Sequence, residues 1–136
     1  PVKAQVSNFV QGFPSTWPAS VAMVVANPNY KRFPLPASGF GTFADFYPFY
    51  LGEHANRTCR RLHILGTTIV LALDTLALLT LSLKVLPFVP LIGYGFAWTG
   101  HFFFEHNRPA TFKHPMYSLM GDLRLWCEVV TRQRPL

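Results

Sequence analysis

The chain has 136 residues, the length of one domain, but half of them are hydrophobic and only 13% are charged. Soluble domains carry about 25% charged residues, so this composition indicates a membrane protein. The net charge is +6, yet the basic residues show no pattern typical of a platform for stacking bases. We therefore expect a membrane as partner and no nucleic acid.

Residues 1–41 differ from the rest of the chain. They hold six of the twelve prolines and show no sustained hydrophobic period. We expect a Pro-rich, loosely ordered extension that is dispensable for the fold. Residues 42–136 are then expected to form the membrane helical domain.

That domain begins with a short aromatic segment over residues 43–51, which predicts a helix that is apolar around most of its circumference despite Pro48. Such a helix is expected at the membrane interface or against a helical bundle. Asn56 follows, and its side chain can cap a new helix that continues through Arg60 and Arg61. Gly66 in that helix would allow a second helix to pack closely.

Two apolar runs, residues 62–83 and 85–104, are each long enough to cross a hydrocarbon core of about 30 Å. Pro87 and Pro90 are expected to break the chain at the hairpin between them. The alternative is a pair of buried helices in a soluble bundle. Arginines flank both outer ends of the pair, which predicts that both ends face the cytoplasm.

Residues 116–130 predict an amphipathic helix after the second apolar run. The expected fold is therefore all-α, an integral membrane helical hairpin or bundle with flanking amphipathic helices.

Metal-capable side chains stand at the outer ends of the hairpin. His101 and Glu105 are four residues apart and would share one helix face, as a ligand and a second ligand or orienting carboxylate must. Glu105 could equally pair with Arg108 or Arg61. Buried ionisable groups of this kind are costly unless paired or bound, so they are candidates for function.

His54 and His63 are nine residues apart and would lie on opposite sides of an unbroken helix. A chain break at Asn56 would let His54 fold back over His63, and antiparallel helices would bring His101 to the same depth. Three neutral imidazoles near Glu105 suit Fe(II), Zn or Mn. Each histidine could instead bond a backbone carbonyl, and His114 is a further candidate ligand. Cys59 and Cys127 are interpreted as unpaired thiols, too far apart for a metal motif.

Three motifs occur in an order that resembles a small membrane family once catalogued as domain of unknown function 962. The resemblance covers about residues 43–134. The motifs are Phe46-Tyr47-Pro48-Phe49-Tyr50 with Glu53-His54-Ala55-Asn56, then Arg61-Leu62-His63-Ile64-Leu65-Gly66-Thr67, then Gly93-Tyr94 with Gly100-His101 through Glu105-Asn107-Arg108-Pro109-Ala110.

Characterised fungal members of that family are Fe(II)-dependent 2-hydroxy fatty acid dioxygenases. The resemblance implies α-oxidation, in which a 2-hydroxy long-chain fatty acid loses its carboxyl carbon and O₂ is consumed at iron. It also implies that the family's histidine positions fall on His54, His63 and His101.

Our interpretation is a mononuclear iron enzyme that takes a fatty acid or other lipid substrate from the bilayer. Glu105 joins the three histidines as a catalytic candidate, and Arg61, Arg108 and Asn56 are candidates for binding the substrate. A guanidinium can make two charge-assisted hydrogen bonds to a carboxylate, and Phe and Leu side chains of the spans would house the alkyl chain. The rival hypotheses are a non-catalytic membrane protein whose polar cluster braces helices or binds lipid head groups, and a zinc hydrolase.

Overall fold

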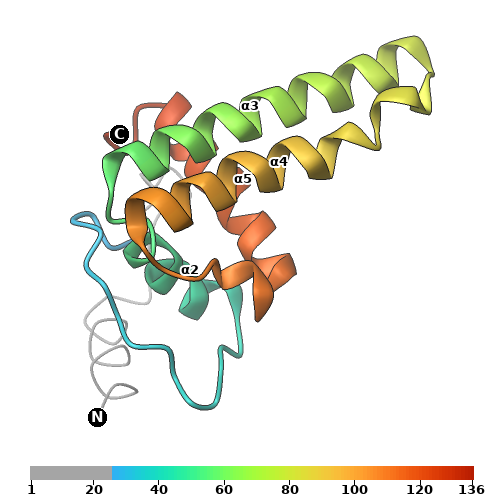
Figure 1. Cartoon of the computed structure of the whole chain (residues 1–136). Helices are drawn as coiled ribbons and strands as arrows, with labels where there is room; N and C mark the ends of the chain where they lie inside the picture. The colour runs from blue at the N-terminus through green and yellow to red at the C-terminus, as the bar shows by residue number, and fades with distance from the viewer. Residues whose placement is uncertain (1–25) are drawn as a thin grey trace, which may run out of the picture.

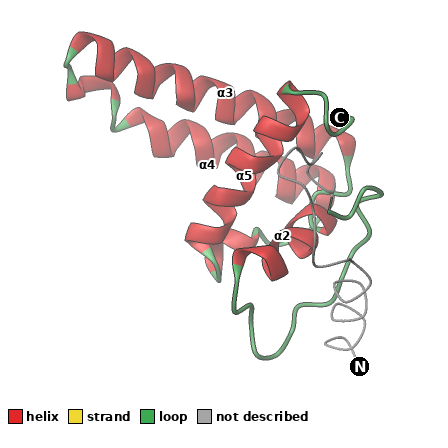
Figure 2. Ribbon diagram, turned by 180° about the vertical axis from the view of Figure 1, so that it is seen from behind, coloured by secondary structure: helices red, strands yellow, loops and turns green. Residues whose placement is uncertain are grey.

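A computed structural model describes residues 26–136. Within this range all regular secondary structure is helical, with four α-helices, and a long irregular segment precedes the first of them (Figures 1 and 2). The expected all-α fold is confirmed for these residues. The four helices are α2 (Phe43–Gly52), α3 (Arg57–Thr80), α4 (Phe88–Gly100) and α5 (Pro115–Val130).

The helix α2 is the predicted aromatic helix, and its N-terminus is capped by the Thr42 side chain, which accepts a hydrogen bond from the backbone of Asp45. It is buried against α5. The chain then breaks as predicted, because Asn56 caps α3 by accepting from the backbone N–H groups of Thr58 and Cys59. The loop between the two helices is held by Arg60, which donates to two of its carbonyl groups.

The helices α3 and α4 lie side by side and antiparallel, joined by a tight turn with a 3₁₀ segment at Leu83–Val85 (Figure 1). Gly66 permits this contact, because a Cβ atom there would lie only 2.8 Å from Cβ of Phe96. The close packing expected at Gly66 is therefore present.

The second apolar run does not form one long helix, which corrects the expectation of two equivalent spans. The α-helical part, α4, has 13 residues and a length of about 20 Å, and a π-helical turn at His101–Glu105 follows it. Only α3 among the described helices is long and apolar enough to cross a membrane. The π-helical turn ends where His106 takes a left-handed conformation, with φ of 55°.

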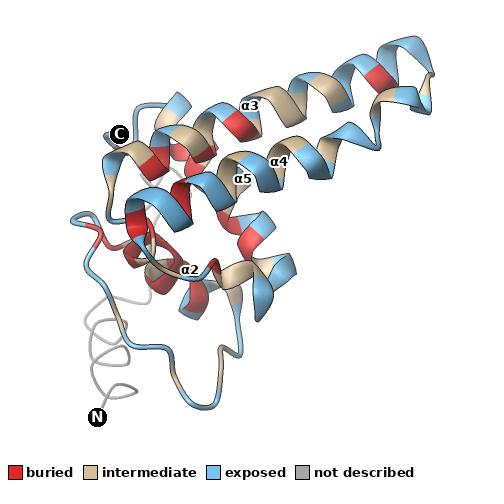
Figure 3. Ribbon diagram, in the orientation of Figure 1, coloured by how far each residue is buried: buried red, intermediate tan, exposed pale blue. Residues whose placement is uncertain are grey.

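The core lies at one end of the hairpin, where α2 and α5 pack beside it, and Figure 3 shows the buried residues gathered there. Residues 26–41, expected to be loosely ordered, contribute to this core. Tyr30 is 9% exposed, and its ring lies under the guanidinium of Arg60 at 3.8 Å. Arg134, buried near the end of the chain, donates to the carbonyl groups of Ala26 and Asn27. Residues 26–41 therefore contact the core in the described structure, and residues 1–25 lie outside the described part.

Candidate metal centre

Three histidines from separate parts of the chain meet in the core. His54 follows α2, His63 lies in the second turn of α3, and His101 begins the π-helical turn after α4. Their exposed fractions are 1%, 6% and 2%, and their ring centroids are 4.3 to 5.1 Å apart. The break at Asn56 and the antiparallel hairpin thus bring together the three side chains that the sequence pattern predicted would meet.

Each imidazole is fixed through its Nδ1 atom by an oxygen of the protein. A neutral imidazole that donates from Nδ1 keeps a lone pair on Nε2, which is how metal-binding histidines are commonly oriented. The three Nδ1 contacts are His54 with the carbonyl oxygen of Tyr50 at 2.6 Å, His63 with Oδ1 of Asp122 at 2.7 Å, and His101 with Oδ1 of Asn107 at 2.8 Å.

The Nε2 atoms of His54 and His63 are 3.2 Å apart. If both rings donate from Nδ1, no proton lies between these two nitrogens and their lone pairs face each other. A metal ion removes this conflict, since 3.2 Å is a natural separation for neighbouring ligands with bonds of about 2.1 Å. Burial, and then the neighbouring His63 and His101, hold the pKa of His54 well below its usual range, so that ring stays neutral and able to bind a metal.

Cys59 belongs to the same cluster, although sequence reasoning treated both cysteines as remote from any metal motif. One ligand atom from each of His54, Cys59, His63 and His101 lies within 4.8 Å of the others. Cys59 precedes His63 by four residues on α3, so the two side chains share a helix face. That spacing was the signal available in the sequence. Cys127 is a free, exposed thiol elsewhere.

The oxygen partner of His63 was also missed. Asp122 on α5 accepts both from His63 and from the Tyr50 hydroxyl, the latter at 2.5 Å. Burial and the adjacent carboxylate raise the pKa of Tyr50, which therefore remains a donor. Asp122 sits 59 residues beyond His63 in the chain, so no local pattern pairs them.

A second chain of contacts supports His101. Asn107, which accepts from His101, donates through its amide nitrogen to Oε2 of Glu53 at 2.9 Å. Asn107 belongs to one of the motifs in the sequence, but its role follows only from this geometry.

Glu105 is buried, and it does not belong to the group of metal-capable side chains formed by the histidines. It accepts from the guanidinium of Arg32 at 2.6 Å and from the backbone N–H of Asn56. Glu105 therefore pairs with an arginine, but with Arg32 and not with Arg108 or Arg61 as predicted. His101 and Glu105 stand at the two ends of the π-helical turn, and their side chains bind different partners, Asn107 and Arg32. Through Arg32 and Asn56, Glu105 connects residues 26–41 and the start of α3 to the π-helical turn.

The sequence model of one family, described as 2-hydroxy-palmitic acid dioxygenase Mpo1-like, matches residues 40–134. This range includes the three histidines with Tyr50, Asn107 and Asp122. The chain belongs to the Mpo1-like family. No curated protein and no solved structure matches it.

In this Mpo1-like chain the proposed substrate-binding residues lie apart from the histidines. Arg61 is exposed on α3, and the Asn56 side chain is engaged at the helix cap and with the carbonyl of Phe104. Arg108 lines a cavity of about 670 Å³ together with Lys113 and His114. His114 is outside the histidine cluster, where it packs on aromatic rings, and His106 is exposed.

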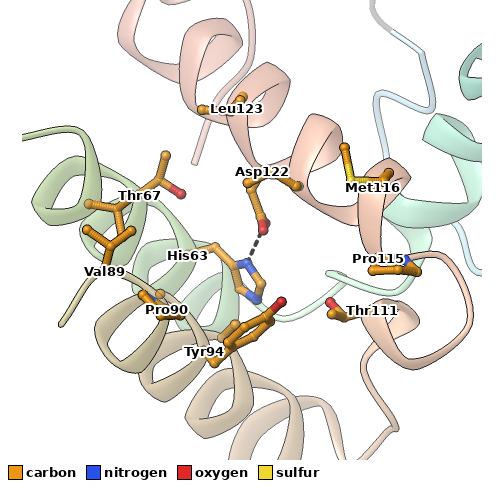
Figure 4. A pocket seen from close by; sticks show the side chains of 14 residues that line it. His63, Thr67, Val89, Pro90, Tyr94, Thr111, Pro115, Met116, Asp122 and Leu123 are labelled. Atoms are coloured by element: carbon orange, nitrogen blue, oxygen red, sulfur yellow. Dashed lines mark hydrogen bonds and ion pairs between the residues drawn. The ribbon is translucent and has the colours of Figure 1, made fainter. Parts of the chain in front are cut away.

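A second cavity of about 290 Å³ adjoins the cluster between α3, α4 and α5 (Figure 4). His63 and Asp122 form part of its wall, and Tyr94 and Thr111, also labelled in Figure 4, line the same cavity. Most of the remaining wall is apolar. The cavity gives a molecule of mixed polarity a place beside His63.

Proposed function

We propose that this chain is a non-haem Fe(II) dioxygenase that converts a 2-hydroxy long-chain fatty acid into the acid one carbon shorter. The observation that carries the proposal is the set of three imidazoles, each anchored at Nδ1, whose Nε2 atoms are left for a metal. The description of the matching family supplies the reaction type and the substrate class. His54, His63 and His101 would hold the metal.

The net reaction balances with O₂ as the sole oxidant: a 2-hydroxy acid and O₂ give the shorter acid, CO₂ and water. Bound Fe(II) would supply the activation of O₂. The protein residues orient the imidazoles and exclude water. Asp122, Asn107 and the Tyr50 carbonyl group set the ring orientations, and burial keeps the site dry.

We further propose that the outer part of the α3–α4 hairpin enters the bilayer and presents the site to lipid. The support is the apolar length of α3, together with large exposed side chains on both helices. On this arrangement the histidine cluster lies at the polar end of the hairpin, near the membrane surface. Arg61 and Arg108 remain candidates for attracting a carboxylate, although neither lines the cavity beside His63.

The decisive experiment combines metal analysis with product mass. Protein purified without oxygen should contain about one iron per chain, and with 2-hydroxypalmitate and O₂ it should release the C15 acid with one O₂ consumed per product. Folded, metal-free protein without turnover would contradict the proposal and favour the helix-bracing alternative. Zinc content with activity in the absence of O₂ would favour a hydrolase.

A further inference from the structure

The cavity beside His63 runs lengthwise along the hairpin. On α3 its wall is formed by His63, Thr67 and Val70, which recur at helical spacing along one face. Seven residues of helix correspond to about 10 Å. On α4 the wall includes Val89, Gly93 and Ala97, so the cavity follows both helices away from the histidine cluster.

The two ends of this cavity differ in polarity. The end at His63 carries Asp122, the single ionisable carboxylate among the lining residues. Toward Val70 and Val89 the wall is apolar, and beyond it the hairpin exposes Leu78 and Leu83. A ligand that matches this gradient has a polar head at His63 and an apolar tail directed toward the outer end of the hairpin.

We propose that this cavity binds the alkyl chain of the substrate, and that Gly93 keeps it open. This inference rests on the proposed function, because that function places the reacting carbons at the histidine cluster. It departs from the expectation that Phe and Leu side chains of the spans house the chain, since α3 and α4 contribute neither Phe nor Leu to the wall.

The side of the cavity between α4 and α5 is open to the surroundings. Tyr94 on α4 and Met116 and Leu119 on α5 line it and are 43%, 66% and 51% exposed. An alkyl chain longer than the cavity can therefore continue into lipid without meeting a closed wall. We expect the enzyme to select for the presence of the first several methylenes and to tolerate differences in length beyond them.

Gly93 and Gly95 provide a matched pair on the same helix. A Cβ atom at Gly93 would make an ordinary contact of 3.5 Å with Val70, and a longer side chain there would extend into the cavity. At Gly95 nothing lies within 4 Å of such an atom, and Gly95 does not line the cavity. Leucine at either position adds the same apolar bulk to α4, so only its placement differs.

A second pair lies on α5, where the side chains are already exposed and folding is not at risk. Leu119 lines the cavity, whereas its neighbour Met120 does not and is 42% exposed. Leu119→Trp should narrow the cavity, and Met120→Trp serves as its control.

The test uses the iron-loaded full chain in lipid nanodiscs with 2-hydroxypalmitate and with 2-hydroxybutyrate, whose two remaining carbons barely enter the cavity. Each excluded methylene weakens binding about fourfold. Gly93→Leu and Leu119→Trp should thus raise KM for 2-hydroxypalmitate at least tenfold, with little change for 2-hydroxybutyrate. Gly95→Leu and Met120→Trp should resemble the unmodified protein. Equal KM values in all four variants, or equal losses in targets and controls, would overturn the proposal.

A binding measurement without turnover separates this inference from the proposed function. Palmitate, which lacks the 2-hydroxyl group, is titrated by displacement of a fluorescent fatty acid. Weaker palmitate binding in Gly93→Leu but not in Gly95→Leu supports the alkyl site even if no variant turns over 2-hydroxypalmitate, in which case the proposed reaction alone fails. If turnover is present and palmitate binding is the same in both variants, the alkyl site fails and the reaction stands.

Discussion

The two ends of the α3–α4 hairpin differ in both composition and surroundings. At the inner end, α2, α5 and residues 26–41 pack around the helices and enclose the histidines. At the outer end, Leu78, Leu79 and Leu81 are 74%, 78% and 88% exposed. Figure 3 shows this change along the hairpin.

The difference shows how one helix pair can pack against protein at one end and expose an apolar surface at the other. The inner end buries polar side chains and gives each of the three histidines an oxygen partner. The outer end presents apolar side chains that no described residue covers, which a bilayer would cover at no cost. The candidate site thus lies where packing by protein gives way to the exposed part of the hairpin.

The largest effect is expected from removing a histidine at the inner end. His54→Ala, His63→Ala or His101→Ala deletes one of three candidate ligands, so iron content and turnover should fall together by more than 100-fold. Metal analysis and oxygen uptake measure the two losses. His106 is the exposed residue after the π-helical turn, so His106→Ala is the control and should retain both iron content and turnover. Full iron occupancy in all three cluster variants would refute the site.

A loss of stability is expected when the contact between residues 26–41 and the inner end is removed. Tyr30→Ala should lower the free energy of unfolding by about 3 kcal/mol, because it empties a core position beneath the Arg60 guanidinium. Tyr30→Phe keeps the ring and loses only the hydrogen bond to the carbonyl of Pro135, at about 1 kcal/mol. Denaturant titration in detergent gives both values. An unchanged denaturation midpoint for Tyr30→Ala would support the prediction that the extension is dispensable for the fold.

A smaller effect is expected at the oxygen partner of His63. Asp122→Asn retains an oxygen that can accept from His63 but removes the negative charge, so iron affinity should drop about 10- to 100-fold while the fold persists. Competition with a chelator measures the affinity. Met120→Ala, at an exposed position of the same helix outside the cavity, is the control. Equal iron affinities in the two variants would show that Asp122 does not tune the site.

The smallest effect on stability is expected at the outer end. Leu79→Ala in detergent should change the free energy of unfolding by less than about 0.5 kcal/mol, because the side chain is 78% exposed. Leu79→Arg should instead weaken association with liposomes, since a charge in the hydrocarbon region costs about 3 kcal/mol. Flotation assays report this partition. Unaltered flotation of Leu79→Arg would place the outer end outside the bilayer.

Local sequence patterns were sufficient for α2, α3 and α5 and for the meeting of the histidines. The aromatic residues predicted α2, and the capping side chain of Asn56 predicted the start of α3. The apolar stripe predicted α5. Given a break at Asn56 and an antiparallel hairpin, His54, His63 and His101 had to lie near one another. These features follow from helix periodicity and capping, which act over a few residues.

The tertiary structure alone decided which side chains support that cluster. Asp122 reaches His63 across 59 residues, and Arg32 reaches Glu105 across 73. A π-helical turn at His101–Glu105 interrupts a run that reads as continuous apolar helix, and Glu105 at its end pairs with Arg32. Such pairings depend on how α5 and residues 26–41 pack against the hairpin, and no period within either segment encodes the contact. The sequence by itself therefore determined the elements and the candidate ligands, whereas packing determined their oxygen partners, the place of Cys59 and the cavity beside His63.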